Sequence, residues 1–341
     1  MTSSTAIERS LDPSGSLNTC WTSLPKYFSC LAPMEDVTDQ AFRRILLKYG
    51  RPDLFFTEFT SVSGLMSDIG RQNVIHRLSY SSEEHPIIAQ IWGTDPQEYF
   101  EGTRIVKEMG FDGVDINMGC PVKKIVKQGA CSALIKSPTL AIEIIKAVQE
   151  ASGGELPVSV KTRMGFDRIV TESWISMLLE TNIEALTLHP RLAIEMSTKS
   201  ADWSQVKVAV DLRDRLSKGT VIVGNGDVTS VSHGVALCKK YGCDGYMVGR
   251  GIFNDPYLFS DNYDDQKKGV YDRIEVLIEH LELHKELWED TKNFHKMKKF
   301  YKMYIKGFDG AVDLRDKLMR LQSIEDTISY LKSFIGKIVD N

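Results

Sequence analysis

From residue 27 to residue 251, short runs of apolar and β-branched residues alternate with longer amphipathic stretches. The apolar runs cover residues 27–34, 54–59, 87–92, 113–118, 158–164, 185–191, 221–227 and 245–251. Helical periodicity fills most of the intervals, at residues 39–49, 96–109, 138–150, 171–180, 203–216 and 228–241, and only residues 61–82 lack a clear pattern. Strands that alternate with helices are typical of βα units around a parallel sheet.

Eight such runs in one chain predict an α/β fold, a (β/α)8 TIM barrel. A doubly wound open sheet fits less well, because no Gly-x-Gly-x-x-Gly turn follows the first apolar run. Beyond Tyr257 the strand runs stop, and helical patterns cover residues 274–288, 295–306 and 323–338 after a polar linker at 261–268. We therefore expect a disordered tail (1–24), a barrel domain (25–260) and a small all-α helical domain (261–341).

The bulk composition is that of an ordinary globular protein, with 42% hydrophobic and 26% charged residues among 341. No apolar run is long enough to span a bilayer, and the Ser- and Thr-rich first residues lack the apolar block of a signal peptide. We therefore expect a cytoplasmic protein that does not bind membranes. The six cysteines have neither the density of a disulfide scaffold nor the paired spacing of a metal site, so reduced thiols are expected.

If the chain forms a barrel, functional groups should lie where its strands end, on the carboxyl-terminal face. The predicted strand ends carry Pro33 and Met34, Thr57 and Glu58, Gln90, Asn117 and Cys120, Lys161 and Arg163, His189 and Arg191, Asn225 to Asp227, and Gly249 and Arg250. Any one of these residues is explained as a surface turn or cap. Their coincidence on one rim predicts a functional site.

Glycine is frequent at the last two strand ends, at Gly224, Gly226, Gly249 and Gly251, with Arg250 among them. TIM barrels commonly bind phosphate between the loops after strands seven and eight, where backbone N–H groups must approach it closely. We therefore expect a phosphorylated substrate or cofactor at this place.

Gln90, Lys161 and His189 are strand-end groups that suit the edge of a planar heterocycle such as an isoalloxazine, whose reduced anionic form a lysine would stabilise. Taken singly, Lys161 is more simply explained as a lysine whose stem covers apolar surface, and His189 as a hydrogen-bonded core histidine. No His or carboxylate pattern has the spacing of metal ligands, so no metal is expected.

Cys120 lies in the turn Gly119-Cys120-Pro121, at the end of a buried run and before the basic pair Lys123-Lys124. A lone cysteine is more often an inert small hydrophobe than a catalyst. Beside a flavin, however, its thiol could act as a general acid opposite a hydride transfer. Action as a nucleophile would need an adjacent base, for which His189 is the candidate.

The net charge of −4 and the pI near 6.0 argue against a uniformly basic nucleic-acid binder. Positive charge is nevertheless concentrated between residues 292 and 320, most densely at Lys296, Lys298, Lys299 and Lys302, and aromatic residues are interleaved with it. By itself this pattern fits a solvated helix face with a core stripe as well as it fits an RNA-binding surface. The concentration of positive charge in one appended region favours polyanion binding.

Several motifs together point to a family. They are Leu31-Ala32-Pro33-Met34, Val37-Thr38-Asp39, Asp115 to Pro121 with Lys123-Lys124 and Gly129-Ala130, Val160-Lys161-Thr162-Arg163, Asn225-Gly226-Asp227, Val248-Gly249-Arg250 and Tyr304-Ile305-Lys306-Gly307. From Tyr27 to the last helices, the chain resembles the tRNA-dihydrouridine synthases of the bacterial type. These are FMN enzymes that reduce a uridine in the D arm of tRNA to 5,6-dihydrouridine.

The resemblance implies roles for the matching residues. Cys120 would protonate carbon 5 of uracil while reduced flavin gives hydride to carbon 6, and NADPH would be the reductant. Pro33, Met34, Gln90, Lys161 and His189 would hold the flavin ring, Asn225, Gly226, Asp227, Gly249 and Arg250 would surround its phosphate, and Asn117, Arg163 and Arg191 would lie near the nucleotide. The barrel would be the FMN-binding catalytic domain, and the helical domain, with Lys296, Lys298, Lys299 and Lys302, would bind tRNA. We expect a monomer.

Two residues depart from the family pattern. Pro190 stands between His189 and Arg191 where glycine is usual, which removes backbone freedom and leaves the direction of Arg191 open. Cys131 stands where a small residue is usual and adds a second thiol to the loop after Gly129. Two other functions stay open: an FMN barrel acting on a free pyrimidine, as dihydroorotate dehydrogenases do, and a non-catalytic tRNA-binding protein on the same fold.

Overall fold

The computed structural model describes residues 19–217, 219–260, 269–289 and 291–339. Its centre is a parallel sheet with the strand order β1-β9-β8-β7-β6-β5-β4-β2. The strands are β1 (Phe28–Leu31), β2 (Phe55–Phe56), β4 (Ile87–Trp92), β5 (Gly113–Met118), β6 (Val158–Gly165), β7 (Ala185–Leu192), β8 (Val221–Asn225) and β9 (Gly245–Val248). The short β3 (Thr60–Ser61) follows β2 and also pairs with β4.

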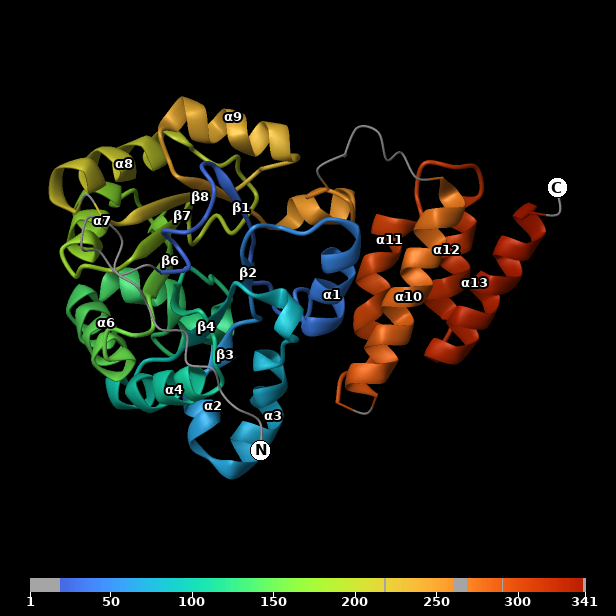
Figure 1. Cartoon of the computed structure of the whole chain (residues 1–341), viewed down its shortest axis with the longest axis horizontal. Coiled ribbons are helices and arrows are strands. Elements are labelled where there is room, and N and C mark those ends of the chain that lie inside the picture. Colours follow the sequence, from blue (N-terminus) through green and yellow to red (C-terminus); the bar gives the residue numbers. More distant parts are fainter. Residues whose placement is uncertain (1–18, 218, 261–268, 290, 340–341) are drawn as a thin grey trace.

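The sheet closes on itself between β1 and β2. Cys30 forms a parallel bridge with Leu54, the Leu31 N–H donates to the Leu54 carbonyl at 3.2 Å, and the Leu54 N–H donates to the Ser29 carbonyl at 3.1 Å. This closure makes the eight-strand barrel that the alternation of apolar runs predicts, and it excludes the open sheet (Figure 1).

Helices cover the outside of the barrel (Figure 1). They are α1 (Gln40–Tyr49), α4 (Pro96–Glu108), α6 (Pro138–Ser152), α7 (Thr171–Leu179), α8 (Ser204–Leu216) and α9 (Val231–Tyr241). Local sequence fixes several of their ends: the Asp39 and Asp95 side chains accept hydrogen bonds from the first turns of α1 and α4. Gly153 and Gly242 end α6 and α9 in the left-handed conformation, with φ of 62° and 79°.

Residues 61–82, which show no clear sequence pattern, form a series of short elements. These are α2 (Val62–Met66), α3 (Asp68–Val74) and two single-turn 3-10 helices, η1 (Ile75–Leu78) and η2 (Ser82–Glu84). The Ser61 and Ser67 side chains each cap the next helix, only six residues apart. Such closely spaced helix starts leave no room for a repeated apolar period.

Residues 19–24, which the sequence prediction placed in the tail, contact the barrel, while residues 1–18 lie outside the described part of the chain. Trp21 is buried, and its ring lies 6.2 Å from the rings of both Phe28 and Phe56. The Cys20 thiol donates to the Asp112 carbonyl at 3.2 Å. Trp21 and Cys20 thus anchor this segment, and its largely polar composition does not reveal these contacts.

The chain ends in a helical region that Figure 1 shows beside the barrel. Its elements are α10 (Val270–Trp288), the 3-10 helix η5 (Phe294–Phe300), the short α11 (Tyr301–Tyr304), α12 (Ala311–Arg320) and α13 (Ile324–Val339). The predicted linker at 261–268 lies outside the described residues. The sequence prediction missed α12, because the exposed Val312 and Met319 blur the stripe formed by the buried Leu314 and Leu318.

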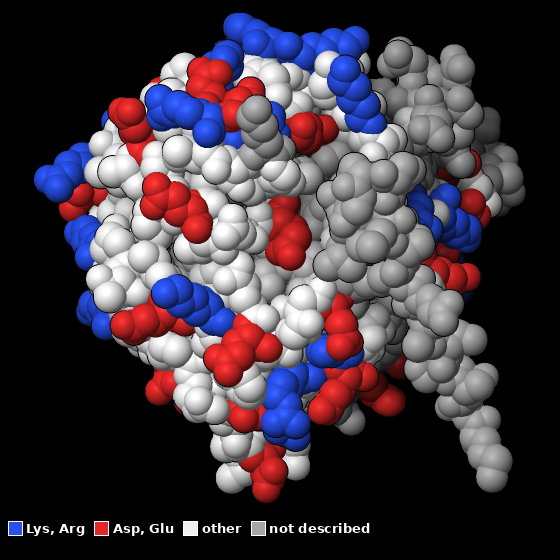
Figure 2. Space-filling model, turned by 60° about the vertical axis from the view of Figure 1, so that its left-hand side comes forward, with Lys and Arg blue, Asp and Glu red and all other residues white. Residues whose placement is uncertain are grey.

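The helical region packs against α1, and one hydrophobic core runs through both parts. The Phe42 ring on α1 lies 5.5 Å from the His280 ring on α10 and 5.1 Å from the Phe300 ring. Over the described residues, no helix is both long and apolar enough to cross a membrane. Lys and Arg are interspersed with Asp and Glu on the face that Figure 2 shows.

Candidate active site

A cavity of about 530 Å³ opens at the carboxyl-terminal ends of the barrel strands. Its lining contains the predicted strand-end residues Pro33, Met34, Gln90, Asn117, Cys120, Lys161, Arg163, His189, Arg191, Asn225, Gly226, Asp227, Gly249 and Arg250. The sequence reasoning missed Glu35 and Phe59, which lie in loops, and Asn254, which ends the 3-10 helix η4 (Arg250–Asn254); all three also line the cavity. The closed barrel therefore brings one rim of polar groups around a space of ligand size.

Asn117, at the end of β5, fixes the turn that carries Cys120. Its side-chain oxygen accepts hydrogen bonds from the N–H groups of Gly119 at 3.0 Å and Cys120 at 2.9 Å. Its Nδ2 donates to Gln90 Oε1 at 2.8 Å. The position of the cysteine thus depends on a side-chain network that begins on the neighbouring strand β4.

The same network continues into the barrel interior. Gln90 Nε2 donates to Asp115 Oδ2 at 2.7 Å, and the Ser159 hydroxyl donates to Asp115 Oδ1 at 2.6 Å. Burial raises the pKa of Asp115 to about 6. Burial also lowers the pKa of Lys161 on β6 to about 8, and the nearby Arg163 lowers it further. Lys161 therefore still carries its positive charge at neutral pH, but it loses its proton more easily than an exposed lysine does.

The Cys120 thiol is partly exposed to the cavity and has a second thiol as its neighbour. A hydrogen bond with Cys131 is the main cause that lowers the pKa of Cys120 to about 7. Burial works against this shift, whereas the Val122 backbone and the Arg163 charge support it. A thiol with this pKa exchanges its proton readily near neutral pH.

Pro190 coincides with a β-bulge in β7. Arg163 pairs with His189, but the next pair joins Gly165 to Leu192, so β7 carries one extra residue. The Arg191 guanidinium consequently bonds within the cavity wall: Nη1 contacts His189 Nε2 at 2.9 Å and Nη2 donates to Asp227 Oδ1 at 2.5 Å.

The contact with Arg191 fixes the state of His189. A guanidinium only donates hydrogen bonds, so His189 Nε2 accepts and the ring proton is assigned to Nδ1. Burial, with the charges of Lys161, Arg163 and Arg191, holds the pKa of His189 well below its usual value. His189 therefore contributes a neutral ring to the cavity.

Arg163 is also occupied by the protein itself. Its Nε donates to the Gly119 carbonyl at 2.7 Å, and its Nη1 donates to the carbonyls of Leu192 at 3.1 Å and Met196 at 2.8 Å. The guanidinium thus ties the cysteine turn to the loop after β7. Direct contact of Arg163 and Arg191 with a nucleotide stays a prediction.

The ends of β8 and β9 form a cradle of backbone groups. Gly226 has φ of +127°, and an added Cβ would lie 2.9 Å from Ala201 Cβ and 3.2 Å from the His189 ring. Among the described residues, none accepts a hydrogen bond from the N–H groups of Gly226 or Arg250. These donors, together with the Arg250 side chain, have the chemistry of a phosphate site.

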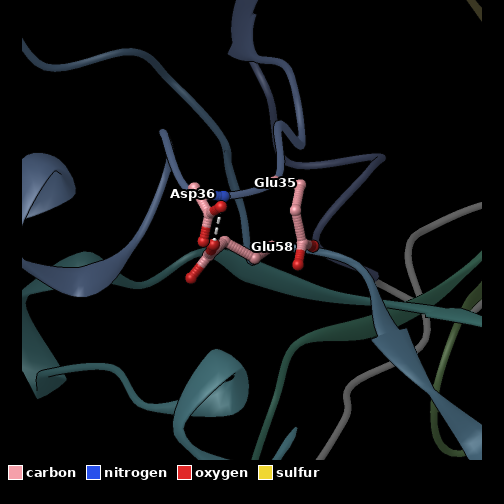
Figure 3. A group of neighbouring side chains, drawn as sticks. All are labelled: Glu35, Asp36 and Glu58. Carbon is pink, nitrogen blue, oxygen red and sulfur yellow. Dashed lines mark hydrogen bonds between the residues drawn. The ribbon is translucent and has the colours of Figure 1, made fainter. Parts of the chain in front are cut away.

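Three carboxylates gather at the edge of the cavity (Figure 3). Glu35 and Asp36 follow β1, Glu58 follows β2, and their oxygens lie within 4.8 Å of one another. Each has a cationic partner: Arg77 for Glu35 at 2.7 Å, Lys296 for Asp36 at 2.6 Å, and Lys292 for Glu58 at 2.6 Å. The cluster is therefore charge-compensated, and it joins the barrel to the helical region instead of presenting free metal ligands.

The four lysines predicted to contact tRNA differ in their surroundings. Lys296 pairs with Asp36, and Lys298 donates to the carbonyls of Met319 at 2.7 Å and Leu321 at 2.8 Å. Lys299, whose Nζ also donates to the Asp36 carbonyl at 2.9 Å, lines a second hollow of about 390 Å³. The other lining residues are Lys302, Phe253, Asn254, Met303 and Lys306. Asn254 lines the barrel cavity as well, so the two hollows adjoin.

The fold and the rim define a TIM-barrel protein with a cation-rich cavity at the carboxyl ends of its strands. A morphinone reductase variant in complex with tetrahydroNAD aligns over 72% of this chain and 88% of its own, with a TM-score of 0.50 and 12% identity. Histamine dehydrogenase from Rhizobium sp. 4-9 aligns over 74% of this chain and 48% of its own, with a TM-score of 0.50 and 13% identity. At these identities the likeness concerns the fold alone.

The sequence comparisons are more specific. A family model described as "Dihydrouridine synthase (Dus)" matches residues 30–338. A Staphylococcus aureus protein named "Probable tRNA-dihydrouridine synthase" is 40% identical over 316 residues, which is 92% of this chain and 95% of the relative. A Bacillus subtilis protein named "Probable tRNA-dihydrouridine synthase 2" is 38% identical over 94% of this chain and 98% of its own. The chain belongs to the dihydrouridine synthase family, which confirms the resemblance seen in its motifs.

Proposed function

We propose that this protein is a flavin-dependent enzyme that reduces a uridine in the D arm of tRNA to 5,6-dihydrouridine. Its family and the names of its relatives support the reaction. The observation that carries it is one cavity lined by an acidic thiol, Cys120, by the cation Lys161 and by the phosphate-type cradle at Gly226 and Arg250. FMN as the prosthetic group, NADPH as the reductant and a monomeric, cytoplasmic protein complete the proposal.

The cavity residues fit FMN. The unpaired N–H groups at Gly226 and Arg250 would hold the phosphate, while Gln90, Lys161 and His189 would meet the ring. Bound flavin supplies the hydride that carbon 6 of the uracil receives. The Lys161 ammonium would stabilise negative charge in a bound flavin ring, and the low pKa of His189 keeps that residue from adding a competing charge.

Cys120 supplies the proton to carbon 5. Because its pKa is about 7, about half of the thiol is protonated at neutral pH and available as a general acid. Asn117 holds both N–H groups of the turn, so the thiol is presented from a fixed backbone. The network through Gln90 anchors that turn to the barrel, which should preserve the alignment that proton transfer needs.

The helical region (261–341) would bind tRNA beside the catalytic barrel domain (25–260). A uridine within folded tRNA must leave its stack to enter the cavity, at a cost of a few kcal/mol. Lys299, Lys302 and Lys306, in the hollow that adjoins the cavity, are placed to contact phosphates and offset that cost. Phe253 and Met303 give the same hollow an apolar wall.

The decisive experiment combines cellular and purified components. Dihydrouridine is mapped at nucleotide resolution in tRNA from cells with and without the protein, and the assay is repeated with purified protein, FMN, NADPH and that tRNA. Cys120→Ala should retain flavin and NADPH oxidation but form dihydrouridine at least about 100-fold more slowly. Cys243→Ala, which removes a buried thiol outside the cavity, is the control. A protein that never binds flavin, or a fully active Cys120→Ala, contradicts the proposal.

The tRNA-binding role has its own test. Lys299→Gln with Lys302→Gln should raise the KM for tRNA and leave NADPH oxidation in the absence of tRNA unchanged. An enzyme for a free pyrimidine would show no such split, since it has no use for the basic hollow. Turnover of free uracil or orotate that is insensitive to the two substitutions would favour that alternative.

A further inference from the structure

Cys131 is the only other thiol near the proposed proton donor among the described residues, and it is in hydrogen-bond contact with Cys120. Ser132, directly after it, donates its backbone N–H to the Cys120 carbonyl at 3.3 Å. The two cysteines therefore lie at the start and the end of one loop, and the short helix α5 (Lys123–Val126) lies between them. Cys120 is partly exposed to the cavity, whereas Cys131 is fully buried behind it.

The backbone at Cys131 is strained. Its φ is +55°, in the left-handed region that glycine adopts freely and other residues adopt at a cost of about 1–2 kcal/mol. Glycine would relieve that strain, yet the chain places a cysteine there with its sulfur against Cys120. A side chain kept at a strained position beside a reactive group points to a function of that side chain.

We propose that Cys120 and Cys131 are the site of a reversible oxidative modification, in which a hydroperoxide converts the two thiols into an intrachain disulfide that closes the 120–131 loop. Only the effect on activity rests on the proposed function of Cys120. The cross-link itself follows from the hydrogen-bond contact between the two thiols and from the backbone bond that holds their segments together.

The chemistry balances in two steps. The Cys120 thiolate attacks one oxygen of the peroxide, the O–O bond breaks, and the products are a sulfenic acid and hydroxide or an alkoxide. The Cys131 sulfur then attacks the Cys120 sulfur, an S–S bond forms, and the sulfenic oxygen leaves as water with the Cys131 proton. A dithiol reductant returns both electrons and restores the thiols.

The chain contains a second thiol pair that serves as an internal comparison. Cys238 and Cys243 are also in hydrogen-bond contact, but both are buried and the pKa of Cys238 is raised far above its usual value. Cys120 has cavity access and a pKa of about 7, so a substantial fraction is thiolate at neutral pH. Peroxide should therefore select the first pair and spare the second.

The test uses the flavin-loaded, full-length protein without tRNA. After treatment with hydrogen peroxide, free thiols are alkylated and the protein is digested with trypsin. Oxidation should join peptide 108–123, which contains Cys120, to peptide 128–136, which contains Cys131, and dithiothreitol before alkylation should separate them. The linked pair should be at least about tenfold more abundant than any link between Cys238 and Cys243. Sulfinic Cys120 without the linked pair overturns the proposal.

Two variants test the role of Cys131. Cys131→Ser keeps the size of the side chain, and Cys131→Gly relieves the left-handed strain, so at least one should fold. After peroxide and then dithiothreitol, wild type should recover most of its initial activity, whereas each variant, compared with its own untreated sample, should recover at least about tenfold less. Equal recovery in wild type and variants contradicts the proposal. If the linked peptide pair forms but dihydrouridine formation is unchanged, the cross-link is supported and the catalytic role of Cys120 is refuted.

Discussion

Replacement of Lys292 by methionine is the sharpest test of how the barrel and the helical region are joined. The Lys292 Nζ donates to Asp39 Oδ2 at 3.0 Å and to Glu58 Oε2 at 2.6 Å, and all three side chains are buried. Burial alone would raise the pKa of Asp39, but the Lys292 charge holds it below its usual value. Methionine fills most of the same volume without the charge, so two carboxylates would lose their shared cation.

The cost follows from the burial of this triad. Removal of one partner from a buried ion pair costs about 3–5 kcal/mol, because the other charge stays desolvated and uncompensated. An unfolding entropy of about 2.1 cal/mol/K per residue gives roughly 0.7 kcal/mol/K for 341 residues. Lys292→Met should therefore lower the Tm by about 4–7 °C.

Urea unfolding and calorimetry measure this change. Glu58→Gln removes one of the two carboxylates, so Lys292→Met with Glu58→Gln should cost less than the sum of the single changes. Lys332→Met is the control, since its pair with Glu282 is exposed and should contribute about 0.5 kcal/mol or less. A loss below about 1 kcal/mol for Lys292→Met, or strict additivity with Glu58→Gln, would refute the reasoning.

Three further predictions concern pH and the cysteine turn. Burial lowers the pKa of His280 to about 3 in the folded protein, so on acidification the unfolded chain takes up a proton at this residue first. The free energy of unfolding should therefore fall as the pH drops below about 6.5. His280→Phe should remove about 2 kcal/mol of the stability loss between pH 7.5 and pH 5, as measured by urea unfolding. Asn117→Ala should slow dihydrouridine formation about 100-fold with flavin retained, whereas Asn117→Asp, which still accepts from the turn, should be less affected. If Cys120 is the acid, single-turnover reduction of tRNA should decline above pH 7, and an alkaline limb that persists unchanged in Cys120→Ala would contradict that assignment.

Much of the candidate site could be predicted because the barrel converts sequence order into spatial order. Gln90 and Asn117 are 27 residues apart, yet both lie in the carboxyl-terminal halves of adjacent parallel strands and their side chains share a hydrogen bond. Apolar runs locate such strands in the sequence. Because the functional sites of these barrels lie at the carboxyl ends of the strands, the polar residues near those ends are predicted to line the site. The glycine-rich ends of β8 and β9 were predictable for the same reason.

The contacts between the barrel and the helical region could not be predicted in this way. Lys292 and Glu58 are 234 residues apart, and no periodicity or motif in the sequence indicates that they form a pair. In the sequence, Lys292 was one of many basic residues and Glu58 one more strand end. Their pairing depends on how α10 packs on α1, which is decided by side-chain volumes such as those of Phe42 and Phe300.

For the two arginines of the rim, the sequence predicts the position correctly but does not predict which groups the side chains bind. Sequence order places Arg163 and Arg191 at the cavity, but carbonyl groups occupy the first, and the bulge at Pro190 turns the second toward His189 and Asp227. Among the described residues, Lys161 and Arg250 then remain as the cavity cations with neither an ion pair nor a side-chain hydrogen bond to the protein. A negatively charged ligand would meet Lys161 at the floor and Arg250 beside the glycine cradle. Two such cations suit a ligand with two negative groups, which is consistent with the proposed FMN, whose reduced ring and phosphate are both anionic.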